Sequence, residues 1–589
     1  MLAAAITERM KADYPDDVCY FFFNSLRHNA NDSNAAFRSI LAQILQKRRG
    51  DERLLELFSF AMYFGSDGQL TASHREIEEL FDLSVQLPSI QRLFLVLDGL
   101  DECEQDDFLS KVVPKLRKLC SLRHVNLVLF GRETIKTDIT DLDGLRHLHI
   151  GSLNYQDIKR LLHEGLVSLV RKRYLPQHLD LDDSSSRLAR RADGMFLWAC
   201  LMKSFLGCRA LTLAERIMAI SEIDSPEGLE NMYERILAII ARGGMPVLQL
   251  ASRVFLWLSH GIRGLTPKEL QEAVDPDRVI SSVDQPLETE AFSDTVIWSC
   301  GGFVEQTWHK GQSQAPDNIR FRFIHASVKE YFNKISTQAV LQSDEFQGVK
   351  LILHTIPANI CLATQCLRYV TYTIPAQPLS VTFRSARCDP NMRLAFPLSD
   401  YATRYWPAHL FQTESILPAV EDAKLSKMEY SQLISALQAF LGQPNVLTAW
   451  IETCYIFGKP PDFQNLLDWA SKVSEGRSLW SELEPEVLHL AKRVEDFASQ
   501  LESIIRGWDS HLIEDPNCAW QEVIAYSNSE FFPKNQGIGM GQLVSDAPIG
   551  TKLAGQPVSK ITKLVSGGVH DLVLSIYPTR YFKFDAPIK

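Results

Sequence analysis

The chain has 589 residues, 46% apolar and 10% aromatic, so it is long enough for several hydrophobic cores and too apolar for wholesale disorder. Its 72 acidic and 61 basic side chains give a formal net charge of −11, which argues against a general affinity for nucleic acid or anionic membranes. The eleven cysteines lack metal-site spacing, and we expect their thiols to be reduced. No apolar run reaches the ~20 residues of a membrane span, and the first residues do not resemble a signal peptide. We therefore expect a cytoplasmic protein.

Residues 1–150 alternate between helix-like and strand-like segments. Apolar residues have helical spacing from Met1 to Lys11, and again in the stretch that Asp32 would cap. Four short apolar runs are typical of buried strands: residues 19–23, 93–97, 125–130 and 147–150. Because a helical stretch separates the second run from the third, we expect a parallel, three-layer α/β sheet with right-handed crossovers.

The next two segments differ in their strand content. Residues 151–245 show no strand signal and are expected to form a helical domain, with Asn154 as its first helix cap. Residues 246–335 contain two strand-like stretches, and Thr266 and Glu269 form a capping box around Pro267 at the start of a helix. The order helix, helix, hairpin, helix predicts a winged-helix domain.

The remainder of the chain is expected to be mainly helical. Amphipathic stretches near 349–369, 430–441 and 486–506 lie in a predicted helical region over residues 336–515. Residues 516–589 are richer in Gly, Pro and β-branched types. This last segment is expected to contain strands, either as a small β unit or as the start of a domain that the chain does not complete.

The segment with the clearest chemistry is the strand over 93–97, which runs into Asp98, Asp101 and Glu102. Ligands of open α/β sheets bind at the carboxyl edge of the strands. Nucleotide hydrolysis needs one carboxylate to hold Mg²⁺ and another to orient the attacking water. The pattern favours a nucleotide site; the competing interpretation is a strand that ends in an acidic surface turn.

Residues 98–102, Asp-Gly-Leu-Asp-Glu, resemble the Walker B segment of NACHT domains in the STAND class of AAA-related NTPases, most closely the nephrocystin-type NACHT proteins abundant in fungi. Other segments resemble the same family, in the same order: residues 20–23 with the helix over 36–45, the sensor strand over 128–132, the helical-domain signature at 192–199, the joining segment over 226–235 and the winged-helix end at 323–332. The resemblance implies that residues 1–150 are a P-loop NTPase core.

The resemblance also implies roles for three acidic residues. Asp98 would hold Mg²⁺, while Asp101 and Glu102 would position the attacking water or sense the γ-phosphate of ATP.

Three further roles are implied, each with a plainer rival. Arg132 would contact the terminal phosphate, although an arginine after a strand often pairs with a carboxylate. His325 would lie near the β-phosphate of ADP, or be a buried histidine bonded to backbone. Pro226 would pack near the adenine, or simply end a linker.

One departure from the family concerns the phosphate-binding loop. The string GxxxxGK[ST], whose amides cradle phosphates and whose lysine neutralises them, does not occur in residues 1–589. The family pattern places it just before the helix that starts near Met1. Two interpretations compete: an incomplete gene model, or a degenerate relative that no longer binds ATP. We favour the first because the rest of the fold looks intact. ATP hydrolysis by the chain as printed is not expected.

Two functions remain open. The first is a nucleotide-dependent signalling switch, in which ADP holds the domains closed, exchange for ATP opens them into a homo-oligomer, and protein partners act as trigger and effector. The second is a nucleotide-independent scaffold whose helical half binds a protein. A winged-helix DNA binder is disfavoured because Lys268 is accompanied by Glu269 and Glu272.

Overall fold

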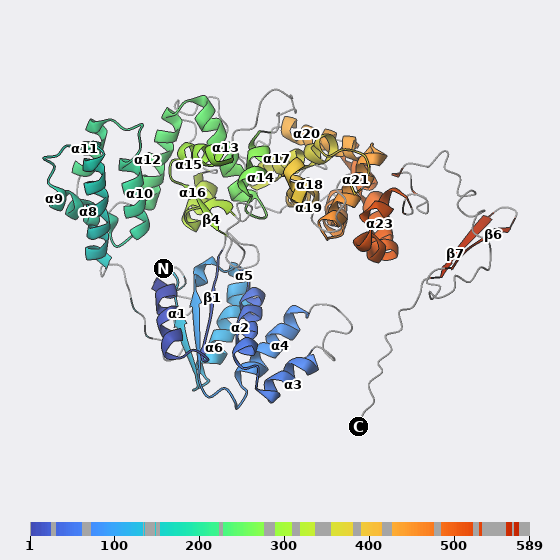
Figure 1. Cartoon of the computed structure of the whole chain (residues 1–589), viewed down its shortest axis with the longest axis horizontal. Coiled ribbons are helices and arrows are strands. Elements are labelled where there is room, and N and C mark those ends of the chain that lie inside the picture. The colour runs from blue at the N-terminus through green and yellow to red at the C-terminus, as the bar shows by residue number, and fades with distance from the viewer. Residues whose placement is uncertain are drawn as a thin grey trace.

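The chain begins with an α/β unit and continues as a mainly helical body (Figure 1). The structure, a computed structural model, describes residues 2–24, 31–61, 72–132, 135, 146, 148, 154–222, 228–275, 289–308, 319–335, 355–380, 390–414, 427–475, 485–521, 523, 529, 531–532, 561–567 and 570–576. Among these, no helix combines the length and apolar content that a membrane span requires.

In the part of the α/β unit that the structure describes, three parallel strands lie in the order β1-β2-β3. The strands are β1 (Val18–Phe22), β2 (Leu93–Asp98) and β3 (Val125–Leu129). The helical elements are α1 (Leu2–Asp13), α2 (Ser33–Lys47), α3 (Glu52–Phe60), α4 (His74–Val85), η2 (Leu100–Glu102), α5 (Gln105–Asp107), η3 (Phe108–Val112) and α6 (Val113–Cys120).

Helices cover both faces of this sheet, with α1 on one face and α2, α4 and α6 on the other (Figure 1). Phe21 and Leu95 point to the α2 side, where they join a cluster with Phe37 and Leu116. Tyr20 alternates with Phe21 and lies under the ammonium of Lys11 from α1, 4.1 Å from the ring centre. Both strand connections put their helices on one face, as right-handed crossovers require. The predicted parallel α/β start is therefore confirmed.

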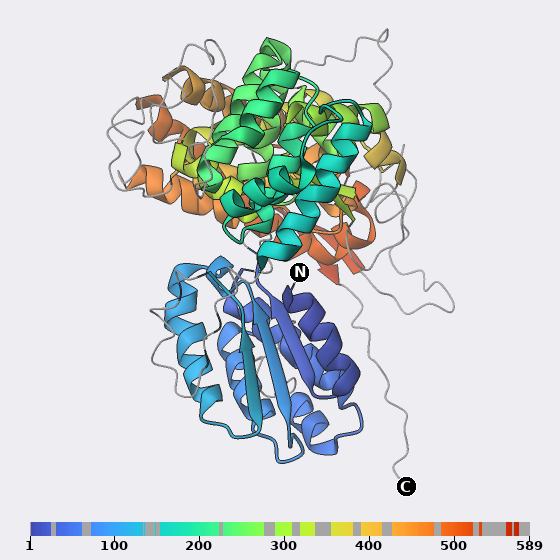
Figure 2. The ribbon, with the colours of Figure 1, turned by 90° about the vertical axis from the view of Figure 1, so that its left-hand side faces the viewer.

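The carboxyl edge of the sheet faces the helical body. Figure 2 shows the three strands running toward the helices above them. Strand β2 is central and Leu95 and Val96 are fully buried, whereas β3 pairs on one side only and Val128 and Leu129 stay partly exposed. Side chains that follow β2 and β3 therefore project toward the body.

The helical body continues from residue 155. Its helices are α8 (Tyr155–Arg171), α9 (Leu181–Ala192), α10 (Phe196–Leu206), α11 (Leu213–Ser221), α12 (Leu229–Arg242), α13 (Met245–His260), α14 (Pro267–Val274), α15 (Thr289–Ser299), α16 (Ala326–Ile335), α17 (Thr355–Arg368), η9 (Tyr369–Thr373), α18 (Pro390–Ala395), α19 (Ser399–Gln412), α20 (Lys427–Leu441), α21 (Pro444–Ile456), α22 (Gln464–Ser474), α23 (Pro485–Glu514) and η10 (Pro516–Trp520).

Among the described residues of this region, four strands accompany the helices. Strands β4 (Val304–Trp308) and β5 (Ile319–Phe323) form an antiparallel pair between α15 and α16. Strands β6 (Ile561–Gly567) and β7 (His570–Ile576) form another, so the strands expected near the end of the chain are present. The predicted capping box is also present: Thr266 Oγ1 accepts from the Glu269 amide at 3.1 Å, and the Glu269 carboxylate accepts from the Thr266 amide at 2.8 Å.

The buried apolar residues of the described segments form two separate hydrophobic cores. Buried apolar residues between 19 and 135 form the core of the α/β unit, and those between 158 and 532 form one continuous second core. In the second core, Phe255 of α13, Phe303, Phe323 of β5 and Phe332 of α16 pack together, with ring centres 4.7–6.2 Å apart. Helix α16 is therefore anchored in the body through its apolar face.

Candidate functional site

The site begins at Asp98, the last residue of β2. Its main-chain carbonyl accepts from the Phe23 amide at 2.8 Å, which fixes the strand end. Its carboxylate is half-buried at the carboxyl edge, and burial raises its pKa above the ordinary value, opposed by a hydrogen bond from the Gly99 amide. Asp98 is thus a carboxylate held at the edge of the sheet where α/β proteins bind ligands.

Gly99 turns the chain directly after Asp98. Its φ of +70° lies in the left-handed region, and a Cβ there would stand 3.0 Å from the Phe23 carbonyl oxygen. The turn leads into η2, where buried Leu100 donates its amide to the Phe130 carbonyl at 3.2 Å. The turn thereby positions Asp101 and Glu102 beside the end of β3.

Asp101 holds Arg132, the residue that follows β3 and Gly131. Oδ2 of Asp101 lies 3.0 Å from Nε of Arg132, and Oδ1 accepts from the Arg132 amide at 3.1 Å. The Asp101 side chain is only 10% exposed. Glu102 adds negative charge near the same guanidinium. Two of the predicted site residues, one from each strand end, therefore form one ion pair.

The same guanidinium reaches out of the α/β unit. Nη1 of Arg132 donates to Oε2 of Glu330 at 2.8 Å, and Glu330 lies on α16 of the helical body. Arg132 is 39% exposed and Glu330 is 55% exposed, so water reaches this half of the arrangement. A single arginine therefore links the sheet edge to α16.

His325, just before α16, heads a second hydrogen-bonded group. Its Nδ1 lies 2.7 Å from Ser327 Oγ and accepts from the Ser327 amide at 3.1 Å. Ser327 Oγ is in turn 2.8 Å from the hydroxyl of Tyr233, on α12. Because Nδ1 accepts from the amide, the proton of the neutral ring resides on Nε2.

The two groups influence each other electrostatically. Burial and the positive charge of Arg132 lower the pKa of His325, while Glu330 and Asp101 partly oppose this. The structure therefore brings five charged or titratable predicted residues to one place: Asp98, Asp101, Glu102, Arg132 and His325. The sixth, Pro226, lies outside the described residues, as does the strand predicted over 147–150 except for Leu148.

Magnesium is the cofactor that the sequence suggested for Asp98. Among the described residues, no cluster of three or more His, Cys, Asp or Glu is arranged to hold a metal ion. Proteins often bind Mg²⁺ through only one or two carboxylates, with water and substrate phosphates as the other ligands. Asp98 fits that pattern as a single ligand, whereas Arg132 already occupies the carboxylate of Asp101.

Three members of the site were not assigned a role from sequence. Tyr233, Ser327 and Glu330 all lie in segments that attract notice as motifs, but their own side chains stood out by neither spacing nor charge. Glu330 is the fifth residue of α16, so the sequence indicates that it lies near His325. The sequence does not indicate that Glu330 pairs with Arg132, which belongs to the α/β unit.

The class that these observations define is an α/β unit with an acidic, arginine-bearing carboxyl edge, contacted by a helical body. Residues 1–132 match a family model described as nephrocystin 3, N-terminal, which relates this unit to that region of the nephrocystin 3 family. The match covers less than a quarter of the chain and ends at Arg132. No curated protein matches the chain.

Proposed function

We propose that the chain is the body of a NACHT-type conformational switch, in which a nucleoside phosphate at the carboxyl edge of the sheet controls the contact with α16. The observation that supports the proposal is the position of Arg132, which pairs with Asp101 of its own unit and with Glu330 of the helical body. A phosphate group that binds this guanidinium would compete with the contact between the units.

The exposures of the two carboxylates indicate which bond would give way. Asp101 is 10% exposed and binds both the side chain and the amide of Arg132, so it keeps the arginine in place. Glu330 is 55% exposed and makes one bond to the guanidinium. Exposed ion pairs are typically weak, about 0–1 kcal/mol. A phosphate would therefore replace Glu330 rather than Asp101.

Asp98 and His325 would complete the site. Asp98 would supply one carboxylate to a Mg²⁺ ion carried with the nucleotide, and that ion would neutralise phosphate charge. Nε2–H of the neutral His325 ring would donate to a phosphate oxygen. Glu102 and Pro226 keep the roles that the family resemblance implies, near the terminal phosphate and the adenine.

We propose further that α14, α15, the β4–β5 pair and α16 are the winged-helix unit expected over residues 246–335, and that it packs against the α/β unit through α16. The boundaries at residues 151, 246, 336 and 516 belong to the same proposal. The continuous core from residue 158 to 532 favours a body that moves as one piece relative to the α/β unit.

Nucleotide titration tests the proposal. Mg·ADP binding to the full-length protein is measured by calorimetry, alongside the Arg132→Ala and Glu330→Gln variants. Arg132→Ala should weaken binding about tenfold or more, and Glu330→Gln should strengthen it severalfold because it frees the guanidinium. Absence of Mg·ADP binding, or the same affinity in all three proteins, would count against the switch.

A nucleotide-independent scaffold is the second candidate, and one observation favours it. Arg132 already pairs with two carboxylates of the chain itself, Asp101 and Glu330. In a scaffold, Asp98→Ala and Glu102→Ala would leave assembly with partners unchanged. In a switch, the same substitutions would alter assembly in the presence of Mg·ATP, which light scattering at matched protein concentration distinguishes.

A further inference from the structure

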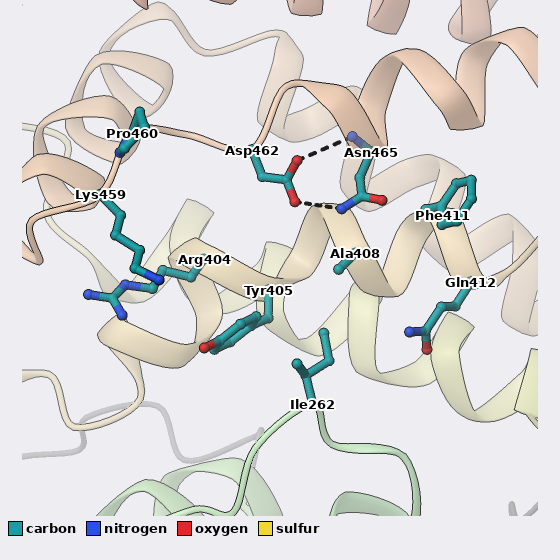
Figure 3. Close-up of a pocket in the computed structure, with 10 residues that line it drawn as sticks. All are labelled: Ile262, Arg404, Tyr405, Ala408, Phe411, Gln412, Lys459, Pro460, Asp462 and Asn465. Atoms are coloured by element: carbon teal, nitrogen blue, oxygen red, sulfur yellow. Dashed lines mark hydrogen bonds between the residues drawn. The ribbon is translucent and has the colours of Figure 1, made fainter. Parts of the chain in front are cut away.

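A surface pocket of about 420 Å³ lies in the helical body, far along the chain from the sheet edge (Figure 3). One wall is a single face of α19, formed by Arg404, Tyr405, Ala408 and Phe411. The opposite wall is the segment between α21 and α22, which contains Lys459. The volume falls within the ~300–1,000 Å³ of small-molecule sites.

One end of the pocket is lined by two cationic side chains and the other by an aromatic ring, whose centre lies 3.9 Å from the ammonium of Lys472. Figure 3 shows the side chains of Arg404 and Lys459 pointing toward each other at one end, and Phe411 at the other. Arg404 and Phe411 are seven residues apart on α19, so these ends are separated by about 10 Å along the helix. Tyr405 and Ala408 lie between them and form a mainly apolar floor.

Arg404 lies at the cationic end and contacts Asp400 and Phe457. Its Nε lies 3.0 Å from Oδ1 of Asp400, its Nη2 donates to the carbonyl of Phe457, and its guanidinium carbon is 5.8 Å from the centre of the Phe457 ring. Asp400 also lies within 3.5 Å of Arg263 and Arg393, so one carboxylate is shared by three arginines. Arg263 also binds both oxygens of Glu269, at 2.7 and 2.9 Å, so Asp400 serves mainly Arg404 and Arg393.

Lys459 adds a second positive charge at this end. Within the described part of the chain its ammonium has neither a hydrogen bond nor an ion pair, and its side chain is exposed. Asp462, the acidic residue of the pocket, is oriented by Asn465, which donates to it from its amide at 3.2 Å and from Nδ2 at 2.5 Å. The pocket is therefore lined by two cationic side chains, Arg404 and Lys459, and by the carboxylate of Asp462.

We propose that this pocket binds a small organic anion, with its carboxylate or phosphate group between Arg404 and Lys459 and a flat apolar body over Tyr405 and Ala408 toward Phe411. Charge-assisted hydrogen bonds to the two cations would fix the head group. The aromatic side chains would cover the apolar body. Because Ile262, from the segment that joins α13 to α14, also lines the pocket, a bound anion would contact both the C-terminal helices and the hairpin-bearing part of the body.

The test uses 2-naphthoate and 2-naphthyl phosphate as probes, with neutral 2-naphthamide as the matched control ligand, in calorimetric titrations of the full chain. Lys459→Ala removes an exposed charge, and Ala408→Leu fills the floor with little loss of helix propensity. Lys172→Ala removes an exposed lysine elsewhere and serves as the control variant. Circular dichroism checks that each variant is folded.

The proposal expects binding of at least one anion, weakened about tenfold or more by Lys459→Ala and by Ala408→Leu, and unchanged by Lys172→Ala. The tighter of the two anions identifies the head group. Binding should also weaken as NaCl rises. The proposal is overturned if neither anion binds at millimolar concentration, if the amide binds as tightly as the anions, or if Lys459→Ala leaves the affinity unchanged.

Discussion

Arg132 and Glu330 are 198 residues apart in the chain, yet their side chains meet at 2.8 Å. The pair joins the α/β unit to a helix whose other face is anchored by Phe332 in the second core. It is a polar link between two bodies that have separate hydrophobic cores. Polar, half-exposed contacts of this kind separate at lower cost than apolar ones, as the switch proposed above would require.

The first prediction concerns the strength of this link. A double-mutant cycle of Arg132→Ala and Glu330→Ala, with stability measured by urea unfolding, should give a coupling energy between the two side chains of about 0.5–1 kcal/mol. This coupling energy should decrease as the NaCl concentration is raised. The within-helix pair Arg75 and Glu79 provides the control, because its removal leaves the junction untouched. A coupling of zero at low salt would show that the contact contributes nothing to holding the units together.

The second prediction concerns the turn after the central strand. Gly99→Ala should destabilise the α/β unit by about 1–2 kcal/mol, because alanine is strained at φ +70° and its Cβ would press on the Phe23 carbonyl. Gly50→Ala, at a site with open space around the added atom, should have little effect. Thermal unfolding followed by circular dichroism compares the two. Equal melting temperatures for the Gly99→Ala and Gly50→Ala variants would mean that the turn after β2 accommodates the added Cβ without strain.

Much of the α/β unit was readable from the sequence because its signals are local. Short apolar runs such as that of β2 identify strands covered on both faces, and Asp32 caps α2 as expected, accepting from the Ala35 amide at 2.6 Å. The acidic residues after β2 could be placed at the carboxyl edge for the same reason. Asn154 was a less successful case: it precedes α8, but its side chain makes no capping bond and donates instead to the Gly194 carbonyl.

The helical body was harder to delineate because its central helices lack a polar face. Every residue from Val446 to Ile456 of α21 is buried, so the helix has no amphipathic period to detect. Helix α19 contains Pro407 and buries Asp400 and His409. Because proline and polar residues are more typical of loops, the sequence of this helix resembles an irregular polar segment. Partners such as Glu330 escaped detection for a different reason, since ion pairs between distant segments leave no local pattern.

The third prediction follows from the buried imidazole of His409. Burial lowers its pKa to about 3, and the neutral ring lies 2.8 Å from the Tyr401 hydroxyl and 2.7 Å from Oδ1 of Asn359. The unfolded chain binds a proton near pH 6.5, whereas the folded chain does not, so stability is full above about pH 6.5 and falls as the pH drops toward 3.

His325 contributes in the same direction, because its pKa is also lowered. Urea midpoints should therefore fall steadily between pH 7 and pH 4.5. This decrease adds to any loss of stability that comes from protonation of carboxylates. His409→Gln should show a shallower decline over this interval, although it is less stable at pH 7. If the urea midpoints of the wild type and of His409→Gln fell in parallel with pH, the His409 imidazole would not be the source of the pH dependence.

The last prediction concerns Glu452, a fully buried carboxylate on α21. One oxygen accepts from the Leu379 amide at 2.9 Å and from Trp520 Nε1 at 2.7 Å, and the other accepts from the Ser380 amide at 2.8 Å. Three donors from two distant segments thus converge on one side chain. Glu452→Gln keeps the shape but replaces one acceptor with an NH₂ group that faces a donor.

The expected cost of Glu452→Gln is about 2–3 kcal/mol, since it leaves buried donors unsatisfied and removes charge-assisted bonds. Trp520→Phe, which removes a single donor, should cost less, about 1 kcal/mol. Equilibrium unfolding gives both values, and hydrogen exchange at the Leu379 and Ser380 amides provides the local readout. Protection of those amides should fall sharply in Glu452→Gln and persist in Trp520→Phe, because only the first substitution alters their acceptor. Unchanged protection in both variants would mean that the two amides are held by something other than this carboxylate.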